Sequence, residues 1–174
     1  MSRKIVFLDD DPHAIGSYAV ELRREGYAPA IASETDEIAA VVAGSLHADA
    51  DLFIIDMMMP SRGLYADDVS ESGLRTGLLV ARDIRNRTPN IPIILWSAAA
   101  FHDLQAVAKR GSKRIPHCIF LRKSMLQQHE LASIVNDYFR TGKFTRGVFM
   151  RLWDAVSIRP SIGGVSVDIK RLKE

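Results

Sequence analysis

Short apolar runs alternate with longer segments of helical periodicity along the first 140 residues. Most of the runs are apolar throughout, as in strands that are covered on both faces of a parallel sheet. Between the runs, apolar residues recur every three or four positions, which is typical of helices packed on such a sheet. The expected strands lie at 5–8, 28–32, 52–56, 91–96 and 118–121. The pattern therefore predicts an α/β fold with a doubly wound, five-stranded parallel sheet.

Capping signals predict where the helices begin and end. Asp11 and Pro12 are typical of the N-cap and first turn of a helix, and Gly26 is suited to close that helix. A capping-box pattern, Ser124–Gln127, predicts the start of the fifth helix. The three helices between them are expected from 33–36 to Gly44, from about Gly77, and around 104–108 up to Gly111.

Two of the apolar runs end in aspartate. Asp9, Asp10 and Asp11 follow the first run, and Asp56 follows the third. Because parallel strands present their carboxyl ends at one edge of the sheet, these acids are expected to lie close together. Carboxylates so close repel one another unless a hard cation lies among them, which predicts a Mg²⁺ site. Asp11 is interpreted as a helix cap only.

Composition and length set limits on the class of protein. The chain has 174 residues and a net charge of +2, which predicts one domain with an addition and argues against a wholly basic nucleic-acid-binding protein. The sequence contains no apolar stretch of membrane-spanning length and no signal-peptide core. The single cysteine, Cys118, cannot form an intrachain disulfide, so we expect a cytoplasmic protein.

Two segments exceed the five-strand plan. The first is a long polar loop, 61–76, which contains Asp67, Asp68 and Glu71 and is interpreted as a solvated loop. The second is the tail 142–174, where periodicity from 144 to 156 predicts a helix and alternation over 165–170 predicts a strand or hairpin. We expect a domain at 1–141 and an extension at 142–174. The extension is basic, with seven Lys or Arg against three acids, but it lacks a second helix for DNA binding. It is expected to pack on the domain or against another copy of the chain.

Four separated features resemble the CheY-like receiver domain of two-component response regulators. They are the pair Asp9 and Asp10 after the first strand, Asp56 followed four residues later by Pro60, Ser97 before a small residue, and Lys123 after the fifth strand. The resemblance spans about residues 3–140. It implies a flavodoxin-like, three-layer α/β/α fold.

The resemblance also implies a role for each of these residues. Asp56 would accept a phosphoryl group from a histidine kinase or phosphotransfer protein, with Mg²⁺ held by Asp9, Asp10, Asp56 and the Met58 backbone carbonyl. Lys123 and the Ser97 hydroxyl would contact the phosphoryl oxygens. The module would be a regulatory phosphoacceptor that switches protein–protein contacts, rather than an enzyme.

The same resemblance also implies how the conformation changes on phosphorylation and how fast the phosphoryl group is lost. Phe120, on the fifth strand, would turn inward when Ser97 moves toward the phosphoryl group, although ordinary packing explains an aromatic residue there equally well. Met58 and Ala99 occupy the positions that tune water attack in this family. Both are apolar, so we expect slow autodephosphorylation.

The chain departs from the family pattern at two points. Ser124 follows Lys123 where the family has proline, so a trans peptide bond is expected. The glycine expected soon after Pro60 does not come until Gly77, because the loop is long.

Two other functions remain open at this point. A haloacid-dehalogenase-like Mg²⁺ phosphatase would use Asp9 as its nucleophile and Asp11 as the second acid, but it would leave Asp56 and Lys123 without matching roles. A degenerate receiver that acts only as a scaffold is the other alternative. The intact acids and Lys123 count against it.

Overall fold

The computed structural model describes residues 2–66, 75–98, 112–144, 158–161 and 164–167. The chain divides into two compact units, Met1–Asn136 and Asp137–Glu174, and each is described by itself. No helix in these described ranges is long and apolar enough to cross a membrane.

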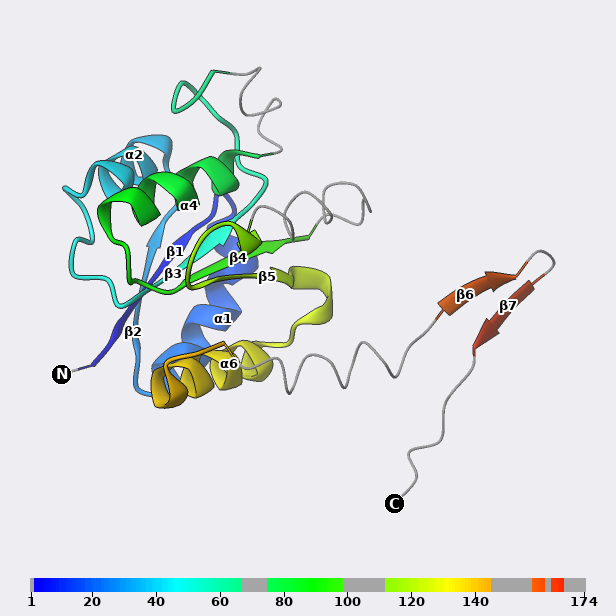
Figure 1. Cartoon of the computed structure of the whole chain (residues 1–174). Coiled ribbons are helices and arrows are strands. Elements are labelled where there is room, and N and C mark those ends of the chain that lie inside the picture. Colours follow the sequence, from blue (N-terminus) through cyan, green and yellow to red (C-terminus); the bar gives the residue numbers. More distant parts are fainter. Residues whose placement is uncertain (1, 67–74, 99–111, 145–157, 162–163, 168–174) are drawn as a thin grey trace. The chain divides into compact units, whose positions relative to one another are not determined.

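The first unit is built on a five-stranded parallel sheet (Figure 1). Its strands are β1 (Lys4–Leu8), β2 (Ala28–Ala32), β3 (Leu52–Asp56), β4 (Ile93–Ser97) and β5 (Cys118–Arg122). Their order across the sheet is β2-β1-β3-β4-β5, with every neighbouring pair parallel. This is the doubly wound, flavodoxin-like order, and it confirms the predicted fold class.

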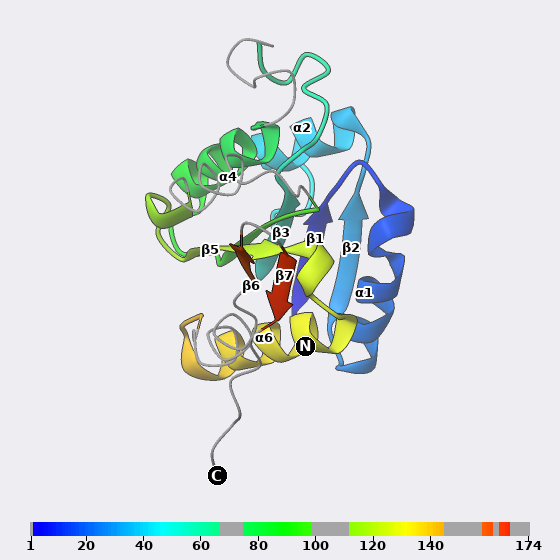
Figure 2. The same ribbon diagram turned by 90° about the vertical axis from the view of Figure 1, so that its right-hand side faces the viewer.

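Helices cover both faces of the sheet, as Figures 1 and 2 show from two directions. The helices of this unit are α1 (Pro12–Arg24), α2 (Thr35–Ala43), α4 (Thr76–Arg87) and the larger part of α6 (Gln128–Thr141). α2 and α4 lie on one face, and α1 and α6 lie on the other. The result is a three-layer α/β/α sandwich.

Alternation along the strands divides the core between the two faces. Side chains of alternate strand residues, including Val6, Ile55 and Leu95, form one cluster with the inner sides of α2 and α4. The residues between them, including Phe7 and Trp96, are fully buried on the opposite face. Because both faces are covered, the interiors of the strands are apolar, and polar side chains gather at their carboxyl edge.

Several predicted helix ends are confirmed. The Asp11 side chain caps α1 by accepting hydrogen bonds from the backbone N–H groups of His13 (3.1 Å) and Ala14 (3.0 Å). Glu34 forms a capping box with Glu37 at the start of α2, and Gly44 ends that helix with a left-handed φ of 81°.

The start predicted for the fifth helix was wrong. α6 begins at Gln128, because residues Lys123–Met125 form a short 3₁₀ turn, η1. The cap is one turn later than expected, where the Gln127 backbone N–H donates to the Glu130 carboxylate at 2.7 Å. β4 also begins two residues later than predicted, at Ile93, directly after Pro92.

The second unit contains a β-hairpin. β6 (Ile158–Ser161) and β7 (Gly164–Val167) pair antiparallel, in the region where the tail sequence predicts a strand or hairpin. The rings of Tyr138 and Phe144 lie 4.4 Å apart in the same unit. The predicted helices at 104–108 and 144–156 lie outside the described residues, apart from Phe144, which is in no helix. Asp67, Asp68, Glu71 and Ala99 are also outside them.

Candidate functional site

The predicted acids lie together at the carboxyl edge of the sheet. β1 and β3 are neighbours with Leu8 opposite Ile55, so Asp9 and Asp56 leave the sheet side by side. One carboxylate oxygen from each of Asp9, Asp10 and Asp56 lies within 4.8 Å of the others. Asp9 and Asp56 are only 1% and 5% exposed, whereas Asp10 is exposed. The site is therefore a buried pair of acids with a third acid at its opening.

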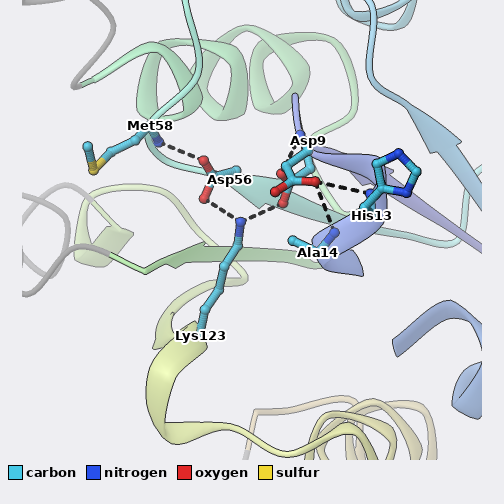
Figure 3. A network of polar contacts seen from close by, with 7 residues as sticks. Asp9, His13, Ala14, Asp56, Met58 and Lys123 are labelled. Atoms are coloured by element: carbon cyan, nitrogen blue, oxygen red, sulfur yellow. Dashed lines mark hydrogen bonds and ion pairs between the residues drawn. The ribbon is translucent and has the colours of Figure 1, made fainter. Parts of the chain in front are cut away.

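Lys123 joins the two buried acids (Figure 3). It begins η1 directly after β5, and its Nζ lies 2.6 Å from Asp9 Oδ2 and 2.9 Å from Asp56 Oδ1. Among the described residues no peptide bond is cis, so the bond between Lys123 and Ser124 is trans, as expected. The fifth strand thus supplies a cation to the acids of the first and third strands.

Backbone N–H groups hold the other oxygen of each buried carboxylate. Asp9 Oδ1 accepts from the Asp11 N–H at 3.1 Å, and Asp56 Oδ2 accepts from the Met58 N–H at 3.2 Å (Figure 3). Each carboxylate is therefore fixed on both sides, by Lys123 and by the turn that follows its own strand.

The electrostatics of the site favour an additional positive charge. Burial raises the pKa of Asp56 to about 7, although the Lys123 ammonium opposes the shift. Burial also raises the pKa of Asp9. Burial alone would lower the pKa of Lys123, but the carboxylates of Asp56 and Asp9 outweigh it and raise that pKa. Three carboxylates and one ammonium leave a net charge of about −2 when all are ionised.

The donor set fits Mg²⁺. The three groups that gather here are all carboxylates, the hard oxygen ligands that Mg²⁺ prefers. Asp10 is exposed, so water can complete the coordination shell. Asp9, Asp10 and Asp56 are the residues that would hold the ion.

The structure separates Asp11 from this cluster. Its carboxylate accepts the N–H groups of His13 and Ala14 at the start of α1, so it serves the helix as predicted.

Ser97 and Phe120 lie on the neighbouring strands β4 and β5. Trp96 lies opposite Asp56 in register, so Ser97, the next residue and the last of β4, is at the same edge of the sheet. Ser97 is buried at 4% exposure. Phe120 is half-buried and packs against the α2/α4 side of the core.

Gly77, predicted as the start of a helix, also lies against Asp56, and that contact was not predicted. It lies at the start of α4, and its N–H donates to the Met57 carbonyl at 3.1 Å. A Cβ on Gly77 would lie 1.9 Å from the Asp56 carbonyl oxygen and 2.8 Å from the Met57 Cα. The helix therefore packs its backbone directly on the segment that follows Asp56. A glycine at the start of a helical pattern, after a long loop, was the available signal.

Trp96 and Tyr18 were not predicted either. The Lys123 Nζ lies 4.9 Å from the centroid of the Trp96 ring, and the edge of Tyr18 contacts that ring at a centroid distance of 5.2 Å. Trp96 was predicted only as a residue of the fourth strand.

The comparisons with known proteins agree with this geometry. No protein-family model and no curated protein matches the sequence. Solved structures do match. A response regulator receiver domain from Clostridium thermocellum is 20% identical, with 85% of this chain and 98% of that chain covered and a TM-score of 0.60.

Two further structures have the same fold. The chemotaxis protein CheY4 of Vibrio cholerae is 17% identical, with 79% of this chain and 98% of that chain covered and a TM-score of 0.57. A BeF3-activated DrrB receiver domain, a protein of Thermotoga maritima, is 14% identical, with 80% and 99% covered and a TM-score of 0.59. The chain therefore has the fold of the CheY-like receiver domains of response regulators.

Proposed function

We propose that this protein is the phospho-accepting receiver of a two-component phosphorelay, with Asp56 as the phosphoacceptor. The observation that carries the proposal is the Lys123 ammonium bridging two buried carboxylates, with a third carboxylate at the opening. The fold supports it, since the similar solved structures are receiver domains. The phosphoryl donor would be a sensor histidine kinase or a phosphotransfer protein.

The residues of the site suit this transfer. An Asp56 carboxylate oxygen forms the new O–P bond while the P–N bond to the donor histidine breaks, and the leaving imidazole takes up a proton. Lys123 already contacts Asp56 at 2.9 Å, so its ammonium is within reach of the incoming oxygens. The Ser97 hydroxyl would donate to the same oxygens. Bound Mg²⁺ would neutralise charge on the carboxylates and the phosphoryl group.

Asp56→Asn tests the proposal. With Mg²⁺ and acetyl phosphate, we expect intact-protein mass spectrometry to show one added phosphoryl group on the wild type, and beryllofluoride to form an equivalent complex. Asp56→Asn should lose this adduct completely, because an amide is not a nucleophile here. The matched control is Asp11→Asn, which removes a neighbouring charge, retains a capping side chain and should still form the adduct.

The same assay distinguishes the alternatives. Hydrolysis of phosphate esters that survives Asp56→Asn but not Asp9→Asn would favour the haloacid-dehalogenase-like phosphatase. The engagement of Asp11 in capping α1 counts against that function, because its carboxylate is already used. A wild-type protein that forms no adduct would instead be a scaffold.

The adduct is expected to be long-lived. Met58 is half-buried beside Asp56 and has no polar group to orient an attacking water. Met58→Asn should therefore speed loss of the phosphoryl group by roughly three- to tenfold, less than the ~10²–10⁴-fold of a general base, because an amide orients water without taking its proton. The measurement is the decay of labelled protein after removal of the donor, with Met59→Leu as the control for a buried neighbour. Equal decay of Met58→Asn and wild type would contradict the expectation.

We propose that the output of the switch is a change in protein contacts rather than DNA binding. The basic tail, 142–174, and the loop 61–76 are the segments beyond the five-strand plan. Two partners are to be tested. One is a second copy of this chain, bound through the tail, and the other is a separate downstream protein. A gel-filtration shift on adding beryllofluoride would identify the first, and an unchanged elution volume would exclude it.

A further inference from the structure

The Lys123 ammonium has an aromatic ring on one side as well as carboxylates on the other. Its Nζ lies 4.9 Å from the centroid of the Trp96 ring, while Asp9 and Asp56 contact it at 2.6 and 2.9 Å. The carboxylates attract the ammonium, but a lysine side chain is long and flexible, so attraction alone does not fix its position. Tryptophan is the best of the aromatic side chains for binding a cation over its face.

The Trp96 ring is itself held by neighbours. It is fully buried, with Phe7 at a centroid distance of 5.7 Å and Tyr18 edge-on at 5.2 Å. Its indole N–H has no hydrogen-bond partner in the described part of the chain. The orientation of the ring therefore depends on packing, with Phe7 and Tyr18 as two of its walls.

Tyr18 connects this packing to the segment that carries Lys123. Its hydroxyl donates to the Leu126 carbonyl at 2.7 Å, immediately after η1. Trp96 is also tied to the acids through the backbone, because the Met57 N–H donates to the Trp96 carbonyl at 2.9 Å. One residue of α1 thus braces both the ring and the turn from which Lys123 projects.

We propose that Trp96 is a positioning residue that fixes the Lys123 ammonium between Asp9 and Asp56, and that Tyr18 braces it. The inference rests on the proposed function, since positioned Lys123 would then meet the phosphoryl oxygens as they arrive. The ring offers a continuous face, so the ammonium can shift from the carboxylates toward a phosphoryl group without leaving it. Phe7 packs against Trp96 as well, but it makes no contact with Lys123 that the structure records.

The first test measures phosphorylation by acetyl phosphate. Trp96→Leu in the full-length protein should lower the rate constant at saturating donor about tenfold, with Mg²⁺ affinity within twofold of wild type. Trp96→Phe should recover most of the rate, because it restores a ring. Phe53→Leu, a similarly buried change on the other face of the sheet, should stay within twofold.

A double-mutant cycle separates positioning from general damage. If Trp96 acts through Lys123, Trp96→Leu should have less than a twofold effect in a Lys123→Ala background. An equal loss of rate in both backgrounds would overturn the proposal, as would an unchanged rate in Trp96→Leu. Tyr18→Phe, which removes only the hydroxyl, gives a milder test should Trp96→Leu fail to fold, with an expected two- to threefold loss.

A second test does not depend on phosphorylation. The ring current of Trp96 should shift the Hε protons of Lys123 upfield in the NMR spectrum, with the signal assigned by its loss in Lys123→Met. The shift should vanish in Trp96→Leu and persist in Phe53→Leu, a change on the other face of the sheet. An unshifted Lys123 in the wild type would overturn the positioning role even if the adduct forms. Absence of the adduct with the shift present would instead refute the proposed function alone.

Discussion

Gly77→Ala is expected to destabilise the protein by about 3 kcal/mol, the upper part of the range for overpacking a close contact. The new methyl group would lie 1.9 Å from the Asp56 carbonyl oxygen and 2.8 Å from the Asp56 carbonyl carbon. Both are backbone atoms of the sheet, so no side-chain rotation relieves the clash. The start of α4 would have to move away from the site. Urea unfolding measures the change.

Gly16→Ala is the matched control for this variant. Gly16 lies in α1, and a Cβ there would meet nothing within 4 Å. Alanine should therefore stabilise the helix by about 0.5–1 kcal/mol. If the two variants shift the urea midpoint equally, the close approach of Gly77 to β3 does not exist. Any folded Gly77→Ala protein should also form the adduct more slowly, because its helix displaces the turn after Asp56.

When Mg²⁺ is removed, the free energy of unfolding is expected to fall as pH rises. A carboxylate in an ordinary ion pair, whose pKa is lowered, has the opposite effect. Burial raises the pKa of Asp56 to about 7, so between about pH 4 and 7 the folded state binds a proton that the unfolded state has lost. Stability in a chelator should therefore fall as pH rises through this window, by about 2–4 kcal/mol, and level off above it. The pKa of Asp9 is raised as well and acts in the same direction. Lys123 titrates above this range.

Asp56→Asn isolates this contribution. The variant should be more stable than wild type in the chelator above pH 7, and its pH profile should lack the fall. Adding Mg²⁺ at about one hundred times its Kd should stabilise the wild type by about 2.7 kcal/mol. Asp10→Asn should lose most of that gain, whereas Asp49→Asn, whose carboxylate pairs with Lys4 away from the site, should keep it. Parallel pH profiles for wild type and Asp56→Asn would refute the assignment.

Much of the fold could be predicted because it depends on local patterns. Apolar runs identify the strands, and because parallel strands end at one edge of the sheet, the sequence predicts that Asp9 and Asp56 lie together. Asp11 could be distinguished from its neighbours because its position before Pro12 is a capping position.

The remaining features depend on contacts that local patterns do not encode. Ser124 is a typical cap residue and Gln127 is not, yet Lys123–Met125 form a 3₁₀ turn and α6 begins after Gln127, whose backbone N–H donates to Glu130. The closeness of Gly77 to Asp56 and of Trp96 to Lys123 joins residues from different elements. A glycine and a tryptophan carry no spacing rule that predicts such partners. The site was therefore predictable in its charged groups and not in its packing.

The docking of Gly77 also has a consequence for protein engineering. The chain leaves the sheet edge at Asp56 and returns to it at Gly77, and Tyr65 anchors the outgoing segment by donating to Asp83 of α4 at 2.6 Å. Because contacts to α4 and to Met57 hold the two ends of the loop, doubling its length should cost only about 0.6 kcal/mol of closure entropy. An insertion between Tyr65 and Gly77 is thus a way to add a fluorescent or affinity module without interrupting a strand.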